Sequence, residues 1–438
     1  MFKTLINAFK VEDIRKKLIY TFLMLIVIRI GSQLPVPGVN RDYFAAWFAA
    51  QNNGAFNFFD AFTGGSFSSM SLFALGVNPY ITSSIIVQLL TIAIPALEEM
   101  QKDGEDGKKK LQKITRYLTI VLALIEAVAM TIGFGNKGLL QEANFINGLG
   151  AVAALVAGSC FVMWIGERIT EKGIGNGISI VLLINIVSRM PDDFVALFHQ
   201  FMNGQPVVKA VIAAIIIVAV VLLTIVLVIF LQDGVRKIPV QYAKKMQGRK
   251  MVGGAATHIP LKVNTAGVIP VIFASSLMSF PGIIMMLIGK SNIEGVGGHI
   301  LNALSQQNWC SLKQPWYSVG LLIYILLVVF FAYFYTSITF NPLEIANNMK
   351  RQGGFVPGLR PGKPTSDFLA KILNYIIFIG AIGLIIVAVI PIFFNGVFGA
   401  SVSFGGTSLI IVVGVVLETI KQVEAQLVNR HYKGFLND

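Results

Sequence analysis

Long apolar stretches separated by shorter polar ones dominate this chain. A bilayer core of about 30 Å is crossed by roughly 20 apolar helical residues, and ten stretches approach that length. They are Leu18–Leu34, Leu72–Leu97, Tyr117–Phe134, Asn147–Ile165, Ile174–Met190, Val207–Leu231, Asn264–Gly289, Trp316–Phe340, Phe368–Phe394 and Thr407–Leu427. Because helices satisfy their own backbone hydrogen bonds in lipid at this length, the pattern predicts an all-α polytopic membrane protein with ten transmembrane helices.

Composition supports this assignment. Hydrophobic residues make up 55% of the 438 residues and charged ones 13%, with a mean hydropathy of +0.72. A soluble domain carries about 25% charged residues, so these charges are too few to cover a soluble surface. Cys160 and Cys310 lie far apart in sequence, which predicts neither a disulfide framework nor a zinc site. The charged residues 1–17 predict a cytoplasmic amphipathic segment and no cleavable signal.

The distribution of basic residues predicts the orientation. Most of the 35 Lys and Arg lie in the N-terminus and in the stretches 98–116, 166–173, 232–263, 341–367 and 421–438. The opposite side holds Arg41, Lys137, Arg189, Lys209, Lys290 and Lys313. Because cytoplasmic loops of membrane proteins are enriched in Lys and Arg, we expect both termini in the cytoplasm.

Two of the cytoplasmic loops, 233–263 and 341–367, are longer than a connection between helices needs and are rich in Lys and Arg. One interpretation is that they set the topology and contact anionic lipids. The other is that they dock an acidic or RNA-rich partner. Their length favours docking, since short loops are enough to set topology.

The second and seventh stretches resemble each other. Gly76–Ile85 and Gly267–Leu277 share Gly, Val, Pro and Ile at equal spacing, and each carries a Ser-Ser pair about one turn later. Ten spans with an internal duplication divide into two five-helix halves, and an odd number per half gives the halves opposite directions in the membrane. We therefore expect two inverted halves, 18–205 and 206–427, followed by a cytoplasmic tail, 428–438.

A further segment, Phe56–Ser71, precedes the second stretch and is too short and too polar to cross a membrane. Such a segment is tolerated at membrane depth where protein or a water-filled cavity surrounds it. The sequence therefore predicts either a re-entrant element that closes a pore or an interfacial helix.

Motifs for catalysis are missing from the sequence. It contains no nucleotide-binding P-loop, no zinc-protease motif and no nucleophile elbow. The ionisable residues deep in the predicted spans are Arg29 and Glu126, and such residues are functional candidates. A proton-coupled transporter usually needs several of them along a relay, and Glu126 could equally pair with Ser or Gln on a neighbouring helix.

At five places the residues resemble the SecY family, the channel subunits of the bacterial Sec protein translocase. The stretches are FALGVNPYI at 73–81, GIGNGIS at 173–179, LKVNTAGVIP at 261–270, FVPGLRPG at 355–362 and FGGTSLII at 404–411. They occur in order and the resemblance extends over all ten spans. It implies an hourglass-shaped channel made of two inverted five-helix halves, without a cofactor.

The resemblance also implies residues for the closed pore. It places a constriction ring at Val77, Ile81, Ile178, Leu182, Ile272 and Ile411, where Val77 and Leu182 depart conservatively from the isoleucine that the family favours. It makes the segment 56–71 a short re-entrant plug helix that closes the resting pore, with Phe59, Phe62, Gly64, Gly65, Phe67 and Ser68 as its candidate residues. Physically, a narrow apolar ring dewets and blocks ions.

For opening and driving the channel, the resemblance implies a lateral gate between spans two and three and spans seven and eight. Its candidate polar residues are Ser83, Gln88, Glu126, Ser275 and Ser276. The cytoplasmic positions that would dock a SecA ATPase or the ribosome are Arg236, Lys237, Arg249, Lys250 and Arg360. The expected partners are SecE-like and SecG-like small membrane subunits, preproteins with signal sequences, and anionic lipids.

Two other functions compete with a polypeptide channel. A secondary transporter also uses inverted repeats and broken helices, but it needs a polar substrate site near the midplane, whereas the residues at these positions are aliphatic. An intramembrane enzyme would need paired acids, a Ser/His dyad or a metal cluster within the spans, and the sequence contains none. Without the resemblance, channel and transporter remain equally supported.

Overall fold

The computed structural model describes residues 8–50, 60, 62–134, 140, 144–202, 206–242, 245–247, 250–252, 256–287, 296–305, 308–310, 314–398 and 406–434. The helices of the first half are α2 (Glu12–Gly31), α3 (Arg41–Ala50), α5 (Asn78–Ala93), α6 (Pro95–Lys102), α7 (Gly104–Phe134), α8 (Phe145–Lys172) and α9 (Gly177–Phe201). The helices of the second half are α10 (Val207–Asp233), α11 (Ile269–Leu287), α12 (Val296–Leu304), η3 (Pro315–Ser318), α13 (Val319–Thr339), α14 (Pro342–Arg351), α15 (Lys363–Phe398) and α16 (Gly406–Gly434).

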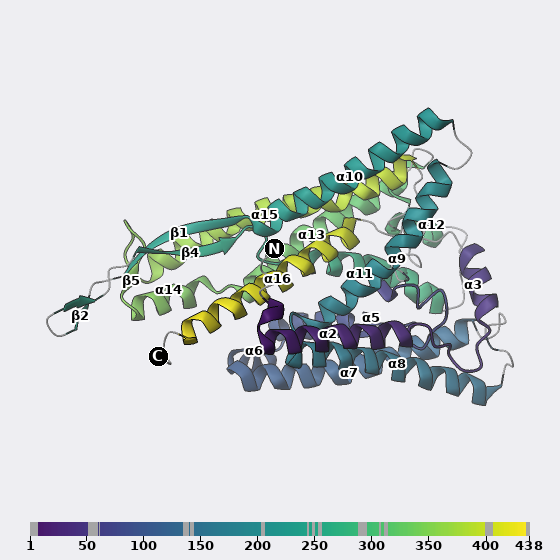
Figure 1. Ribbon diagram of the computed structural model, residues 1–438, viewed down its shortest axis with the longest axis horizontal. Helices are drawn as coiled ribbons and strands as arrows, with labels where there is room; N and C mark the ends of the chain where they lie inside the picture. Colours follow the sequence, from purple (N-terminus) through teal and green to yellow (C-terminus); the bar gives the residue numbers. More distant parts are fainter. Residues whose placement is uncertain are drawn as a thin grey trace.

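Each of the ten predicted stretches contains a helix, which confirms the all-α polytopic fold class. Five helical segments are long and apolar enough by themselves to cross a membrane, and the bent pair α5 and α6 makes a sixth among the described residues. In Figure 1, α2, α5, α7 and α8 lie along the lower side of the bundle, and α10, α13, α15 and α16 lie above them. α9, which follows α8 in the first half, packs against α16, so the helices of both halves join in one bundle.

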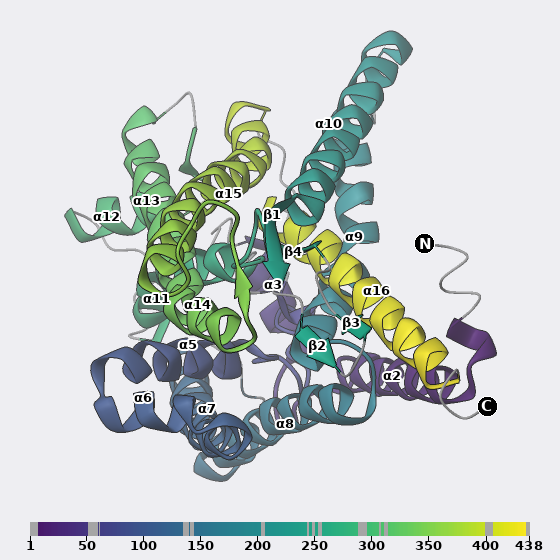
Figure 2. The ribbon, with the colours of Figure 1, turned by 90° about the vertical axis from the view of Figure 1, so that its left-hand side faces the viewer.

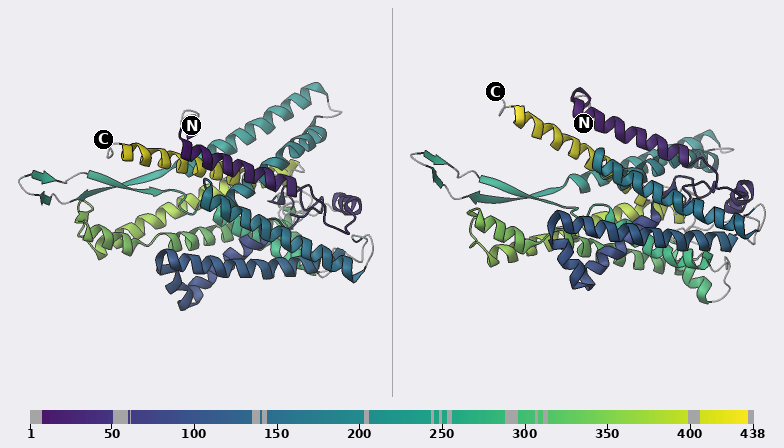
Figure 3. Two further views of the ribbon diagram at one scale, coloured as in Figure 1. Left: turned by 60° about the horizontal axis from the view of Figure 1, so that its bottom comes forward. Right: turned by 90° about the horizontal axis from the view of Figure 1, so that it is seen from below.

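The segments predicted to be cytoplasmic gather at one end of the bundle. Figure 1 shows β1, β4, β5, α14 and the C-terminal part of α16 at this end, with α3 and α12 at the opposite end. The start of α2 lies beside α16, where Ile14, Ile174 and Val423 share a buried apolar cluster (Figure 3). This arrangement agrees with the sidedness that the basic residues predict.

The two long basic loops contain strands, which the sequence analysis did not expect. β1 (Val235–Tyr242) pairs antiparallel with β4 (Ala256–Lys262), and β5 (Gly354–Phe355) pairs with the other edge of β1. A second hairpin, β2 (Lys245–Gln247) with β3 (Lys250–Val252), forms the tip. Figure 1 shows it projecting beyond the helices, and in Figure 2 it lies in front of them. Loops 233–263 and 341–367 are thereby joined through one sheet.

The second span differs from its predicted limits, Leu72–Leu97. Its helix begins at Asn78, after Gly76 adopts a φ of +56°, and ends at Ala93, before Pro95 starts α6. The axes of α5 and α6 are bent by 103°. A proline disfavours the helical conformation of the preceding residue and cannot donate its backbone nitrogen to the helix ladder. The residues around Pro95 therefore turn the chain sharply.

The two repeat segments adopt the same local structure. Gly76 and Gly267 both have a positive φ, of +56° and +65°, and each lies two residues before a helix that carries proline as its second residue. The carbonyl oxygen of each glycine accepts a side-chain hydrogen bond, from Ser159 at 3.1 Å and from Asn264 at 2.9 Å. The similarity read from the sequence thus extends to backbone geometry.

The close packing of α8 against the start of α9 gives a prediction about stability. A Cβ at Gly177 would overlap the carbonyl group of Gly166. Because backbone cannot yield as a side chain can, we expect Gly177→Ala to lower the free energy of unfolding by about 1–3 kcal/mol. Thermal unfolding of the purified protein in a bilayer mimic measures this loss.

The matched control for that variant is Gly150→Ala in α8, where a Cβ would meet nothing within 4 Å. Its free energy of unfolding should stay within about 0.5 kcal/mol of the parent. Equal losses for the two variants would contradict the close contact between α8 and α9.

Candidate pore constriction and plug

The six residues predicted for the ring come together in one apolar cluster. Val77, Leu182, Ile272 and Ile411 are buried in it, and Ile81 and Ile178 pack against it. They come from the start of α5 and from α9, α11 and α16, so both halves of the chain contribute. We call this group, together with its neighbours Ile28, Phe62, Phe73, Val162, Ile165, Ile169, Ile180, Val181, Ile186 and Val415, the constriction cluster.

Local features of the sequence set the position of Ile178 and Leu182. The side chain of Asn176 caps α9, and its Oδ1 accepts the backbone N–H groups of Ile178 at 3.1 Å and Ser179 at 3.4 Å. This cap starts the helix at a fixed residue. Ile178 therefore lies in the first turn, and Leu182 follows one turn later on the same face.

The described part of the plug segment connects two apolar clusters. Phe62 packs in the constriction cluster, whereas Phe67 packs with Phe44 and Phe48 of α3 in a separate core. Residues 62–63 are helical and residues 64–70 form turns. Phe59 lies outside the described residues. The plug segment is therefore a compact turn structure rather than a continuous helix over this range.

Polar contacts hold the plug segment against α2 and α9. Asp60 forms an ion pair with Arg189, and its other oxygen accepts the backbone N–H of Ser68 at 2.8 Å. Asn185 Nδ2 donates to the carbonyl oxygen of Phe62 at 3.1 Å. Arg29 Nη1 lies 3.5 Å from the carbonyl oxygen of Gly64.

The two adjacent glycines of the plug allow this close approach. Gly64 and Gly65 have φ angles of +67° and +82°, which side chains rarely adopt. A Cβ at Gly64 would lie 2.9 Å from Cα of Asn185 and 3.0 Å from Nη1 of Arg29. Glycine at position 64 is thus needed both for the backbone conformation and for contact with α9.

The C-terminal end of the plug segment is tied to the connection between α2 and α3. The backbone N–H of Val36 donates to the carbonyl of Met70 at 3.2 Å, and that of Leu72 donates to Leu34 at 2.8 Å. Arg41 Nε donates to the carbonyl of Ser69 at 2.9 Å. These bonds fix the chain where it leaves the plug and approaches α5.

The predicted gate residues lie on helices that do pack together. α7 packs against both α5 and α11, and α11 packs against α13. However, Ser83 donates to the carbonyl of Pro79, and Gln88 Nε2 donates to Oγ of Ser84, all within α5. Glu126 Oε2 is buried and has no hydrogen-bond partner among the residues the structure describes. Ser275 is buried in α11, and Ser276 is half-buried beside it.

The docking candidates lie on the joined cytoplasmic loops. Arg236 and Lys237 are exposed on β1, opposite Leu261 and Pro260 of β4, and Arg360 is exposed in the turn before α15. Lys250 begins β3, and Arg249 lies outside the described residues. Beneath them, a buried cluster joins the hairpin to α14 and α15 through Ile238, Val240, Leu261, Met349, Val356, Leu369, Ile372 and Ile376. We call the unit of the three-stranded sheet, α14 and the turn 356–362 before α15 the cytoplasmic platform.

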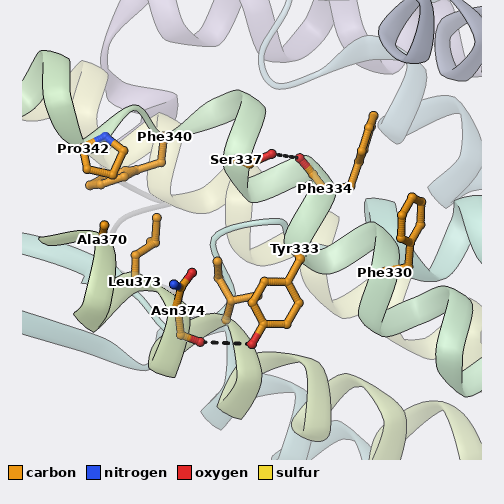
Figure 4. Close-up of a pocket in the computed structure, with 10 residues that line it drawn as sticks. Phe330, Tyr333, Phe334, Ser337, Phe340, Pro342, Ala370, Leu373 and Asn374 are labelled. Atoms are coloured by element: carbon orange, nitrogen blue, oxygen red, sulfur yellow. Dashed lines mark hydrogen bonds between the residues drawn. The ribbon is translucent and has the colours of Figure 1, made fainter. Parts of the chain in front are cut away.

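A separate apolar groove of about 570 Å³ lies between α13 and α15 (Figure 4). Phe330, Tyr333 and Phe334 line one side of it, and Leu373 and Asn374 the other. The Tyr333 hydroxyl donates to the carbonyl of Asn374 at 3.3 Å and bridges the two helices. None of the ring residues lines this groove, which is therefore distinct from the constriction cluster.

Sequence reasoning did not identify Asp60, Asn185 and Arg189 as site residues. A signal was present, because Asp60 interrupts an apolar and small-residue segment, and Asn185 interrupts the apolar stretch of α9. Arg189 contacts Asp60 and Asn185 contacts Phe62, and in both contacts the two residues are more than 120 positions apart in the sequence. The strands of the cytoplasmic platform were also missed, although Ile238 and Val240 alternate with exposed residues in the manner of a half-buried strand.

Comparison with known proteins identifies the family. The family model of SecY matches residues 71–420. The protein translocase subunit SecY of Halalkalibacterium halodurans is 44% identical over 443 residues, with all of both chains covered. A solved protein-conducting channel aligns over 94% of this chain and 93% of its own with a TM-score of 0.65 at 20% identity. Sec61 in the canine ribosome–channel complex aligns over 94% and 93% with a TM-score of 0.61 at 18% identity. The chain belongs to the SecY family of protein translocase channel subunits.

Proposed function

We propose that this chain lines the path by which unfolded secretory polypeptides cross the membrane, and that it releases hydrophobic segments sideways into lipid. The observation that carries the proposal is the constriction cluster. Four elements from both halves bring six aliphatic side chains together, and Phe62 of the plug segment packs among them. A partner supplies the energy, and the chain itself performs no catalytic step.

The resting pore is closed by two layers in this proposal. A narrow ring of aliphatic side chains repels water and therefore ions. The plug segment packs against that ring through Phe62 and is tied at its far end by Arg41. Branched side chains can repack around a passing chain, because dispersion contacts are individually weak and have no fixed direction.

The lateral gate lies between α5 and α7 on one side and α11 and α13 on the other. Glu126 and Gln88 each have a buried oxygen without a described partner in this region. An unsatisfied buried oxygen costs free energy in the closed state. These two residues, with Ser83, Ser275 and Ser276, therefore tune how easily the helices part for a hydrophobic signal sequence.

The cytoplasmic platform is the docking surface for a SecA ATPase or the ribosome. Its exposed Arg236, Lys237 and Arg360 lie on one packed unit, with Arg249 and Lys250 at the hairpin tip in sequence. Because the sheet joins the two basic loops, a partner that binds the hairpin also pulls on α14 and α15. Sec61 in the ribosome-bound structure provides a precedent for a partner of this kind.

The remaining assignments complete the proposal. The chain lies in the bacterial cytoplasmic membrane with both termini in the cytoplasm and inverted halves at 18–205 and 206–427. SecE-like and SecG-like subunits pack on its lipid-facing helices, and anionic lipids contact the basic loops. What supports the orientation is the gathering of the basic segments at one end of the bundle.

Polarity introduced into the constriction should loosen the closed state. We expect Ile272→Asn to wet the ring and to raise export of a reporter with a defective signal sequence by about tenfold, which corresponds to a shift of about 1.4 kcal/mol in the closed–open equilibrium. Export of the reporter is measured in cells in which the variant replaces the parent channel subunit.

The matched control is Val271→Asn, which buries the same amide one residue earlier in α11 but in a different apolar cluster. It should lower stability without rescuing the defective signal. Unchanged export with Ile272→Asn, or equal rescue by Val271→Asn, would remove Ile272 from the ring.

Charge reversal on the cytoplasmic platform should weaken docking. We expect Arg360→Glu to lower motor-driven or ribosome-driven export by roughly tenfold, because a cation that faces an acidic partner becomes repulsive. Lys110→Glu reverses an exposed charge near the start of α7, at the same end of the bundle but outside the cytoplasmic platform, and serves as control. If the two variants lose the same activity with normal protein levels, net charge rather than position 360 governs export.

The polypeptide path itself is tested by a photo-crosslinking amino acid at position 272. A secretory protein arrested halfway should crosslink there, and the crosslink should disappear when its signal sequence is deleted, because the chain then never enters the pore. The same amino acid at the exposed position Leu326 of α13 reports background contacts. Crosslinking at Leu326 alone would move Ile272 out of the path and favour a secondary transporter.

A further inference from the structure

The plug segment contains a carboxylate that is fully shielded from solvent. The side chain of Asp60 is 0% exposed, and both of its oxygens are engaged, one by Arg189 and the other by the backbone of Ser68. A buried charge without a partner is strongly destabilising, so the position of Asp60 depends on the guanidinium that faces it. Arg189 belongs to α9, which makes this pair a tie between the plug and the bundle.

Two neighbouring contacts act on the same stretch of plug backbone. Asn185, one turn before Arg189 in α9, donates to the carbonyl of Phe62, and Arg29 of α2 reaches the carbonyl of Gly64. Backbone carbonyls at membrane depth must find a donor. Arg189 thus holds the plug through the carboxylate of Asp60, and Asn185 and Arg29 hold it through two backbone carbonyl groups. We call Asp60, Arg29, Asn185 and Arg189 the polar latch.

The polar latch belongs entirely to the N-terminal half of the chain. Its bundle residues lie on α2 and α9, and the bonds at the end of the plug come from the connection between α2 and α3. Among the residues that the structure describes, Ile272, Ile411 and Val415 of the C-terminal half share the constriction cluster with Phe62 of the plug, and all three are apolar. Parting of the two halves at the constriction cluster therefore separates apolar surfaces and leaves the polar latch intact.

We propose that the polar latch makes release of the plug a separate step from parting of the two halves, so that the plug stays with the N-terminal half until the Asp60–Arg189 pair breaks. Asp60 and Arg189 are positioning residues in this proposal, since they hold the seal without lining the polypeptide path. The inference rests on the proposed role of the plug as a seal.

The two members of the pair differ in exposure, and this gives unequal expected effects. Arg189→Gln leaves the carboxylate of Asp60 with 0% exposure and without its cation. Asp60→Asn leaves a guanidinium that is 24% exposed and can turn towards water. The loss of the arginine should therefore unseat the plug more than the loss of the carboxylate charge does, and the double variant should resemble Asp60→Asn.

Ion leakage through the resting channel measures the seal. The complete channel complex is reconstituted in sealed vesicles, and efflux of a small ion is followed without a motor or substrate. We expect Arg189→Gln to raise the leak by about tenfold and Asp60→Asn to raise it less. Lys209→Gln removes an exposed cation at the start of α10, away from the plug, and should leave the leak unchanged.

A second readout reports the gate independently. Fluorophores at Leu89→Cys in α5 and Leu277→Cys in α11, both exposed positions, follow the separation of the two sides after Cys160→Ser and Cys310→Ser. In Arg189→Gln the leak should rise while this separation stays as in the parent. A separation that grows in parallel with the leak would overturn the proposal that the two steps are distinct.

Deletion of residues 60–68 distinguishes failure of the polar latch from failure of the plug. If the deletion leaks and Arg189→Gln does not, the plug seals the pore and the latch is wrong. If the deletion itself does not leak, the segment is not a seal, and the proposed function of the plug falls together with this inference. Equal leaks for Arg189→Gln and Lys209→Gln would also overturn the latch.

Discussion

The requirement that every backbone amide and carbonyl in the membrane find a hydrogen-bond partner shapes this protein. Helices meet that requirement by themselves, but helical structure is interrupted after Thr63 in the plug segment and just before α5 and α11. At these places neighbouring side chains supply the missing donors: Asn185 for Phe62, Ser159 for Gly76, and Asn264 for Gly267. The irregular segments can therefore exist at membrane depth because the surrounding bundle satisfies them, and their positions depend on it.

Apolar and polar contacts have different roles in the closed channel. The constriction cluster is held by dispersion and the exclusion of water, which allows side chains to repack without an all-or-none break. The plug also carries an ion pair and backbone hydrogen bonds from α2 and α9, which are directional and which break as units. In the channel that we propose, a deformable ring beneath a plug that is tied to one half provides a physical basis for a seal that yields to a polypeptide and resists small ions.

The cytoplasmic platform is packed against the bundle, so that a partner bound there, as we propose, would act on the helices. β1 is the central strand, since β4 pairs with one of its edges and β5 with the other. Below the sheet, Ile238 and Val240 pack with Leu369 and Ile372 of α15, whose helix continues into the membrane. A force applied to the hairpin is therefore transmitted to a transmembrane helix through packed side chains rather than through a flexible loop.

The sequence by itself determined the class of the protein and its ten apolar helical stretches, because apolar length is a local property of the chain. The family resemblance predicted the six ring residues, and the structure places them in one apolar cluster, whereas their role in a ring stays a prediction. The similarity between the segments at Gly76 and Gly267 could also be predicted, since each segment carries its own glycine turn followed by a proline. The strands of the cytoplasmic platform and the contacts of Asp60 with Arg189 and of Asn185 with Phe62 were decided by tertiary structure. Those features join residues that are distant in the chain, and a buried charge or carbonyl takes whichever donor the folded bundle brings within reach.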